Sequence, residues 1–537
     1  MTSPGNPRRR AGKVALILVV LVFLVSRLYV LAAYPLGSDV PIYAFYALQN
    51  QVASHHGISL FAYRAQKLQQ DTEKAKAAGQ PAPDASDEAT QVEYPPLALA
   101  FLWLPTLGLG DLPTDSAFWA SAQVKYFSPY RIVLSARLEQ YLWYYRFVLL
   151  IVDLLLFGLL WAALPPLGPG EGRFDRVERL TVYLACNLAL WPFLYGRLDL
   201  VLALLVLVAW RVLVSRASFF WAFTLLALAV NFKVVPLVLV PVWVVGSLPA
   251  EREWWRSSVR VGASLAGRTA LLLGLIVAIF LPFLQFLGPD ALGFLAYHRE
   301  RGLEVLSVYS LLLMGLHFLG LPITITRSFK SLGLQSALSP LLVSLSPWLE
   351  AGLLLGATGL LLVHFRRLAE KTPEAPPPRA TLAQTYPNTL LCYTLLFLML
   401  FMAFNKVFSP QYLLWVAPLV YLVPFPRRGR RWFAAGFLLV SILSTILFPY
   451  LFWSDVAIPV GLPTRIGKGG LIFLEEEHPL RFLGPSLRGF FLLAARNLLF
   501  LGLTGILGRY LVRQALATGD SSSVVQPADQ LQLAEGL

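Results

Sequence analysis

Long apolar runs separated by short polar segments divide this chain along most of its length. The first run covers residues 14–33, about the 20 residues that a helix needs to cross a bilayer. Runs of similar character recur near residues 140–164, 180–195, 198–214, 218–232, 234–248, 268–287, 341–365, 386–404, 410–425, 432–452 and 489–513. We therefore expect an all-α, polytopic membrane protein with about twelve to fourteen transmembrane helices.

Two further apolar stretches leave that count open. The stretch 94–110 and its neighbour 111–137 must cross the membrane either twice or not at all, because the flanking segments keep their sides. The stretch 305–321 is short and is followed by a long loop, so we expect no crossing there.

Composition supports a membrane protein. Of the 537 residues 57% are hydrophobic and only 14% are charged, and the mean hydropathy is +0.64, well above soluble proteins. Both cysteines, Cys186 and Cys392, lie in apolar runs, so no disulfide framework is indicated.

The net charge of +14 raises the question of whether the protein binds nucleic acid. The basic residues, however, flank apolar runs, which favours contact with anionic membrane lipids and no nucleic-acid partner.

The basic clusters also predict the topology. They lie at residues 8–13, 173–179, 211–216, 252–260, 366–371, 427–431 and 509–513. If all face the cytoplasm, both termini are cytoplasmic and the chain is a multi-pass protein of the cell membrane. The organisation is then a cytoplasmic N-terminus (1–13), one transmembrane domain (14–513) and a cytoplasmic tail (514–537) expected to be disordered. Its long outer loops would be 34–93, 288–304 and 454–488.

This topology gathers polar residues on the outer side. Asp39 is the first acidic residue beyond the first span, and Lys233 and Lys406 each lie at a break followed by proline. Ionisable groups at membrane depth are costly, so a functional role is the default hypothesis. Structural alternatives remain: Asp39 would cap a helix that has Pro41 in its first turn, and the lysines would extend to the interface.

Other candidates lie in nearby turns. Arg197 and Asp199 flank a turn and would either pair with each other or serve a site; His298 and Arg301 lie in an outer loop. Asp39 and Asp199 offer oxygen ligands that a divalent cation accepts. Because no Asp-x-Asp cluster accompanies them, we expect no metal or other cofactor.

Taken in order, several short motifs resemble the GT-C superfamily of polyprenyl-phosphate-sugar-dependent membrane glycosyltransferases, closest to its alpha-1,2-mannosyltransferase-like branch. They are Arg27 with Ser38-Asp39-Val40 and Tyr43; Glu93-Tyr94-Pro95-Pro96; Gly196-Arg197-Leu198-Asp199; Lys233 with Pro236; His298-x-x-Arg301; and Lys406 with Ser409-Pro410-Gln411-Tyr412. The long insertion after Tyr63 and the segment 121–137 depart from the family pattern, which leaves the acceptor open.

The resemblance implies a function and a set of roles. A hexose, mannose-like, would pass from a polyprenyl-phosphate donor to a lipid-linked or envelope glycan acceptor by an inverting displacement. Asp39 would be the general base. The donor phosphate would be bound by Lys233, Lys406, His298, Arg301 and Arg197. Supporting or acceptor-binding roles would fall to Asp199, Arg27, Tyr43, Tyr94, Ser409, Gln411 and Tyr412.

Two other functions stay open at this point. Broken helices around a polar region also occur in transporters, so a transporter or flippase of lipid-linked sugars is one alternative. No internal repeat between the two halves supports it. A ligase or polymerase of lipid-linked oligosaccharides would share the basic outer face and is the other.

Overall fold

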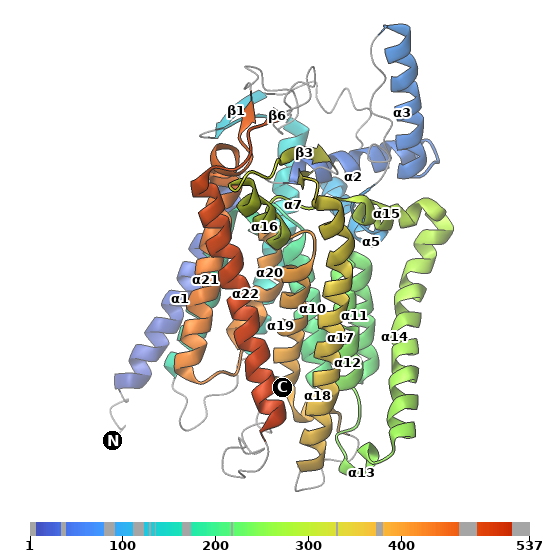
Figure 1. Ribbon diagram of the computed structural model, residues 1–537. Coiled ribbons are helices and arrows are strands. Elements are labelled where there is room, and N and C mark those ends of the chain that lie inside the picture. The colour runs from blue at the N-terminus through green and yellow to red at the C-terminus, as the bar shows by residue number, and fades with distance from the viewer. Residues whose placement is uncertain are drawn as a thin grey trace, which may run out of the picture.

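The computed structural model describes most of the chain as helices that run along a common axis (Figure 1). The described residues are 7–33, 39–79, 92–110, 123–127, 130–134, 136–163, 173–215, 218–328, 331–371, 380–460 and 481–517. A predominantly helical architecture is thus confirmed.

Within these residues, 7 helices are long and apolar enough to cross a membrane. They are α1 (Pro7–Ala32), α7 (Ala136–Ala163), α14 (Ser258–Leu287), α17 (Ser339–Lys371), α19 (Pro387–Phe404), α21 (Arg427–Thr445) and α22 (Leu487–Leu516). Large apolar side chains stay exposed along α1 and α14, as on lipid-facing helices. The multi-pass character is therefore supported, whereas the larger count of crossings stays a prediction.

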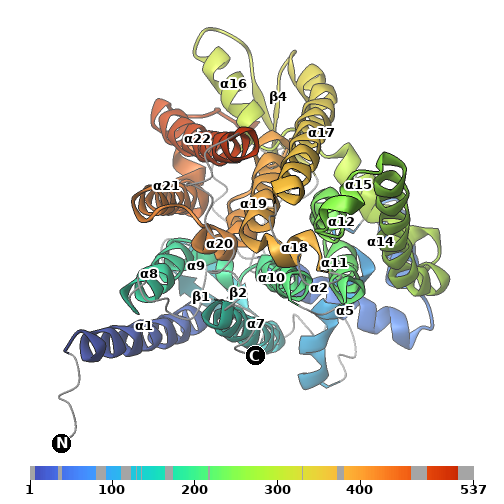
Figure 2. The ribbon, with the colours of Figure 1, turned by 90° about the horizontal axis from the view of Figure 1, so that it is seen from below.

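Shorter helices make up the middle of the bundle. They are α8 (Arg173–Ala189), α9 (Trp191–Leu194), α10 (Asp199–Val214), α11 (Phe219–Phe232), η2 (Val235–Leu239), α12 (Val240–Gly246), η4 (Pro410–Tyr412) and α20 (Leu413–Leu422). Helix α10 packs against α7, α11 and α20. Figure 2 shows α10, α19 and α20 in the interior and α1 and α14 at the periphery. The breaks between α9 and α10 and between α11 and η2 fall where polar turns were predicted.

A cap of short elements covers the end of the bundle opposite the start of α1 (Figure 1). It includes α2 (Val40–His55), α3 (Leu60–Ala77), α15 (Gly293–Glu300) and α16 (Val308–His317). Helix α5 (Pro96–Trp103) runs into η1 (Leu104–Gly108), and η3 (Pro289–Leu292) precedes α15. With 10 residues, α16 is about 15 Å long, half the thickness of a hydrocarbon core. The remaining helices are α13 (Arg252–Trp255), α18 (Leu382–Thr385), η5 (Ile446–Tyr450) and η6 (Phe452–Val456).

The expectation of purely helical structure needs one correction. Three antiparallel two-stranded sheets are present: β1 (Gln123–Phe127) with β2 (Tyr130–Leu134), β3 (Thr324–Ser328) with β4 (Ser331–Gln335), and β5 (Pro459–Val460) with β6 (Arg481–Phe482). In β1 the polar Gln123 and Lys125 alternate with Val124 and Tyr126, a period of two that favours a strand. The stretch 111–137 therefore holds a pair of antiparallel strands, 123–127 and 130–134.

At the C-terminal end, α22 continues to Leu516, so the first residues of the expected tail are helical. Residues 518–537, the rest of the tail, lie outside the described residues, as do 461–480 of the loop 454–488.

Candidate functional site

The first feature of the site is the contact between the start of α2 and the turn before α10. The Asp39 N–H donates to the Gly196 carbonyl at 3.2 Å. Asp39 occupies the N-cap position of α2, but its side chain makes no capping hydrogen bond. Its carboxylate instead forms an ion pair with Arg197, and both side chains keep some exposure, 18% and 13%. The capping alternative is therefore not the contact that this carboxylate makes.

Asp199 faces a different partner. Its Oδ1 lies 2.7 Å from Lys233 Nζ and accepts a hydrogen bond from Trp415 Nε1 at 2.5 Å. Only 3% of the Asp199 side chain is exposed. Asp199 thus contacts Lys233 and Trp415, while Arg197 forms its ion pair with Asp39, although the charge of Asp199 also acts on the Arg197 guanidinium. Residues two apart at the start of a helix point to different sides, so each finds its own partner.

Lys233 lies over an aromatic pair as well. Tyr412 and Trp415 stack with ring centroids 4.1 Å apart, and Lys233 Nζ is 5.4 and 5.0 Å from these two centroids. The ammonium thus joins the end of α11 to the start of α10 and to α20. This carboxylate and aromatic environment competes with the phosphate-binding role expected for Lys233.

Arg301 lies at the opposite side of the network. It follows α15, and its Nη1 is 4.0 Å from Glu93 Oε1. Its Nε donates to Ser331 Oγ of β4 at 3.1 Å. Burial alone lowers the pKa of Arg301, but the carboxylates of Glu304 and Glu93 outweigh it, so the pKa is raised. Arg301 is a permanent cation.

Two more predicted residues lie beside Arg301. Lys406 Nζ donates to the Arg299 carbonyl at 2.8 Å. Burial, together with the positive charge of Arg301, lowers the pKa of Lys406 to about 8. Desolvation by neighbouring segments, together with the positive charges of Arg301 and Lys233, lowers the pKa of His298 to about 4, although the side chain keeps contact with solvent. His298 is therefore uncharged at neutral pH and offers a hydrogen bond in place of the expected positive charge.

The two predicted tyrosines join neighbouring segments. Tyr43 of α2 and Tyr94, just before α5, have hydroxyls 3.1 Å apart, and their rings meet edge to face at 5.6 Å. Both are buried. They hold the segment with Glu93 against the helix that begins at Asp39.

The structure does not bring Arg27 to this site. Its Nε is 2.7 Å from Asp153 Oδ2, and the two side chains are 1% and 0% exposed. The Tyr195 hydroxyl donates to the same carboxylate oxygen at 3.0 Å. Arg27 therefore belongs to a buried pair that connects α1 and α7 to the residues just before Arg197.

Two more of the predicted residues, Ser409 and Gln411, follow Lys406 in the chain. Ser409 donates to Glu304 Oε1 at 2.5 Å, so its hydroxyl is engaged within the protein. Gln411 lies half-buried in η4.

The sequence interpretation missed Glu304, Trp415 and Ser331 as members of the network. Glu304 carried a usable signal, because it is an acidic residue immediately before an apolar stretch. Ser331 carried no usable signal in the sequence, since a serine in a polar segment is common.

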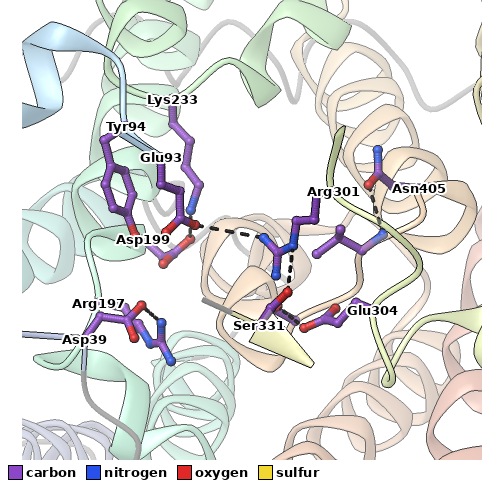
Figure 3. A network of polar contacts seen from close by, with 12 residues as sticks. Asp39, Glu93, Tyr94, Arg197, Asp199, Lys233, Arg301, Glu304, Ser331 and Asn405 are labelled. Atoms are coloured by element: carbon purple, nitrogen blue, oxygen red, sulfur yellow. Dashed lines mark hydrogen bonds and ion pairs between the residues drawn. The ribbon is translucent and has the colours of Figure 1, made fainter. Parts of the chain in front are cut away.

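Figure 3 shows how these groups lie. The Asp39–Arg197 pair and the Asp199–Lys233 pair are on one side, and Arg301, with Ser331 and Glu304, is on the other. Each of three carboxylates is thus close to one cation: Asp39, Asp199 and Glu93. An anionic ligand would have to compete with a carboxylate for a cation here.

In the part of the chain that the structure describes, no three His, Cys, Asp or Glu side chains are grouped closely enough to hold a metal ion. Asp39 and Asp199 are instead separated, each with its own basic partner.

Comparisons with protein-family models, curated proteins and solved structures found no match for this chain.

Proposed function

We propose that this chain is an integral membrane glycosyltransferase of the GT-C type. It would move a hexose, mannose-like, from a polyprenyl-phosphate donor to a lipid-linked or envelope glycan acceptor. The observation that supports this best is one partly exposed carboxylate, Asp39, paired with Arg197 in a polar network whose other side carries Arg301 (Figure 3). A carboxylate that can act as a base and guanidinium groups that can bind an anion are what acceptor activation and phosphate departure require.

The reaction is a direct displacement. Asp39 takes the proton of the acceptor hydroxyl while the hydroxyl oxygen forms a bond to the anomeric carbon. The bond from that carbon to the phosphate oxygen breaks, and the phosphate leaves with the electron pair. Attack opposite to the leaving group inverts the anomeric centre. Arg197, Arg301 and Lys406 stabilise the departing phosphate by charge-assisted hydrogen bonds.

Because Asp39 is paired with Arg197, binding of the donor would also activate the base. While Arg197 neutralises Asp39, the carboxylate is a weak base. The donor phosphate competes for Arg197, and Asp39 becomes a stronger base when the arginine turns toward the phosphate. Donor binding therefore prepares the base for the acceptor.

The proposed placement puts the chain in the cell membrane with about twelve to fourteen crossings, cytoplasmic termini and the site on the outer face. It is supported by the basic residues 8–10 at the start of α1 and by the position of the site at the other end of the bundle (Figure 1). The polyprenyl chain of the donor would then lie along lipid-facing helices.

Reconstituted vesicles test this function. The purified protein is incubated with radiolabelled polyprenyl-phosphate-mannose and a lipid-linked glycan extract. We expect label to appear in a longer, acceptor-linked glycan. Label that only changes leaflet would indicate a flippase, and transfer of a whole oligosaccharide block from a lipid carrier would indicate a ligase; either result contradicts the proposal.

A further inference from the structure

The loop of residues 405–409, which carries Lys406, is held at a single residue, Phe408, from both sides. The Phe408 N–H donates to Glu304 Oε2 at 2.7 Å. The Phe408 carbonyl accepts from Arg496 Nη2 of α22 at 3.0 Å. The guanidinium of Arg496 also lies 3.7 Å from the centroid of the Phe408 ring. Neither the carboxylate nor the guanidinium is a surface group: Glu304 is 8% exposed and Arg496 is 0% exposed.

Glu304 makes further bonds to the same loop. Its other carboxylate oxygen accepts from Ser409 Oγ at 2.5 Å, and its N–H donates to the Lys406 carbonyl at 3.0 Å. The Glu304 carbonyl also accepts from Ser310 Oγ at 2.6 Å and from the Ser307 N–H at 3.0 Å, so five hydrogen bonds involve Glu304, two of them through its carboxylate. The residue is the junction between the loop with Lys406 and the segment that begins at Arg301.

That segment is fixed in turn. Leu334 of β4 donates its N–H to the Leu303 carbonyl at 2.9 Å, and Val305 donates to the Leu332 carbonyl at 3.1 Å. Arg496 Nη1 donates to the Leu306 carbonyl at 3.0 Å. The two segments are therefore held together by both Glu304 and Arg496.

We propose that Glu304 is a positioning residue, which together with Arg496 holds the loop 405–409 so that Lys406 stays beside Arg301, where both would meet the donor phosphate. The mention of phosphate rests on the proposed glycosyltransferase function; the positioning of Lys406 does not. The competing explanation is that Glu304 serves only as a counter-charge for buried Arg496 and Arg301.

Three substitutions separate the two explanations. Glu304→Gln removes the charge but keeps an oxygen for the Phe408 N–H and an amide group that can bond to Ser409. Glu304→Ala removes both contacts. Ser409→Ala removes one hydrogen bond and leaves the buried charges balanced, so it tests the loop even if Glu304→Ala does not fold. Glu253→Ala, on a side chain 72% exposed, is the matched control.

The first readout is independent of catalysis. Full-length protein in detergent is acetylated with an amine-selective reagent between pH 6.5 and 10.5, and labelling of Lys406 is followed by mass spectrometry, with exposed Lys74 on α3 as internal reference. Wild type should label half-maximally near pH 8, and Glu304→Gln should restore that behaviour. In Glu304→Ala the freed, hydrated lysine should shift toward the ordinary value of about 10.4, with Ser409→Ala in between. Wild-type profiles for both Glu304→Ala and Ser409→Ala would overturn the proposal.

The second readout is the Michaelis constant for the donor. Loss of a hydrogen bond to a charged group predicts a KM roughly tenfold to a hundredfold higher in Glu304→Ala, while the acceptor KM stays near wild type. Glu304→Gln should recover most of this loss. A Gln variant as impaired as the Ala variant, and equally unstable to heat, would establish the counter-charge explanation. If wild type transfers no sugar, the proposed function fails, but the labelling result still decides the role of Glu304.

Discussion

Asp39 begins α2, but its carboxylate pairs with Arg197 and does not cap the helix. The backbone of Asp39 is held by the carbonyl next to that arginine, at Gly196. Backbone and side chain therefore attach to the same turn, which fixes both the place of the carboxylate and its ionic partner. In its proposed role as a base, Asp39 would gain basicity when an anion attracts the arginine away.

The Asp199–Lys233 pair predicts a stability effect. Lys233→Ala leaves a carboxylate that is 3% exposed with no ammonium beside it, and breaking such a pair costs about 3–5 kcal/mol. We expect a clearly lower unfolding temperature in detergent, whereas Lys233→Arg, which keeps the charge, should lose less. A Lys233→Ala protein with wild-type stability but weak donor binding would show instead that this lysine serves mainly the phosphate.

Lys406 predicts a pH dependence. With a pKa of about 8, the ammonium is present below pH 8 and is lost as the pH rises through it. The KM for the donor should therefore be level from pH 6 to 7 and rise above pH 8, by up to about tenfold. Lys406→Arg stays charged throughout and should remove the rise. His298, with a pKa of about 4, should add no step between pH 5.5 and 7.5.

Lys406 also predicts how stability depends on pH. Raising the pH should weaken donor binding but increase the free energy of unfolding. The pKa of Lys406 is about 8 in the fold and 10.5 in the unfolded reference, so the unfolded chain binds more protons between these values. This contribution to the free energy of unfolding rises with pH across that window. A titration of unfolding with denaturant, comparing wild type with Lys406→Arg, measures it; a difference that stays constant with pH would contradict the lowered pKa.

The buried Arg27–Asp153 pair should be structural. Arg27→Met alone strands a carboxylate that is 0% exposed and should destabilise the protein by about 3–5 kcal/mol. Adding Asp153→Asn removes the stranded charge and keeps an oxygen for the Tyr195 hydroxyl, so stability should largely return. Turnover of this double variant should stay near wild type. A stable but inactive double variant would place Arg27 in the reaction after all.

Bilayer thickness and turn chemistry made part of this fold predictable from the sequence. The apolar runs and the breaks at 195–198 and 233–236 were predictable, because a bilayer demands about 20 apolar residues per helix and turns need polar ones. The ion-pair partners were not predictable. Arg197 and Asp199 are two residues apart, but their ion-pair partners are Asp39 and Lys233. Such choices depend on how distant segments pack, which local spacing does not encode.

Two features that the sequence interpretation missed, the contacts of Glu304 and the strand pair of β1 and β2, were missed for related reasons. Glu304 was overlooked because its partners are a backbone N–H and a hydroxyl about a hundred residues later in the chain, at Phe408 and Ser409. The strand pair was hidden within an apolar stretch, where its short alternation of polar and apolar residues was outweighed by the longer pattern.

Topology can be checked with reporters. A tag inserted within 297–304 should be accessible from outside, and one within 427–431 only from the cytoplasm, since that segment is rich in arginine. Both sites lie in described parts of the chain. Cytoplasmic accessibility of 297–304 would contradict an outward-facing site, because His298 and Arg301 belong to that segment.

The central claim is that Asp39 removes the proton of the acceptor. Its most direct test is sugar transfer in reconstituted vesicles by wild type, Asp39→Asn and Asp39→Glu, with folding checked by thermal unfolding. We expect Asp39→Asn to lose about 10²- to 10⁴-fold in kcat with donor binding retained or improved, because Arg197 then no longer pairs with a carboxylate at position 39. Asp39→Glu should keep part of the activity, since a base remains but is misplaced. Near-wild-type transfer by a well-folded Asp39→Asn protein would contradict the account and point to Asp199 as the base.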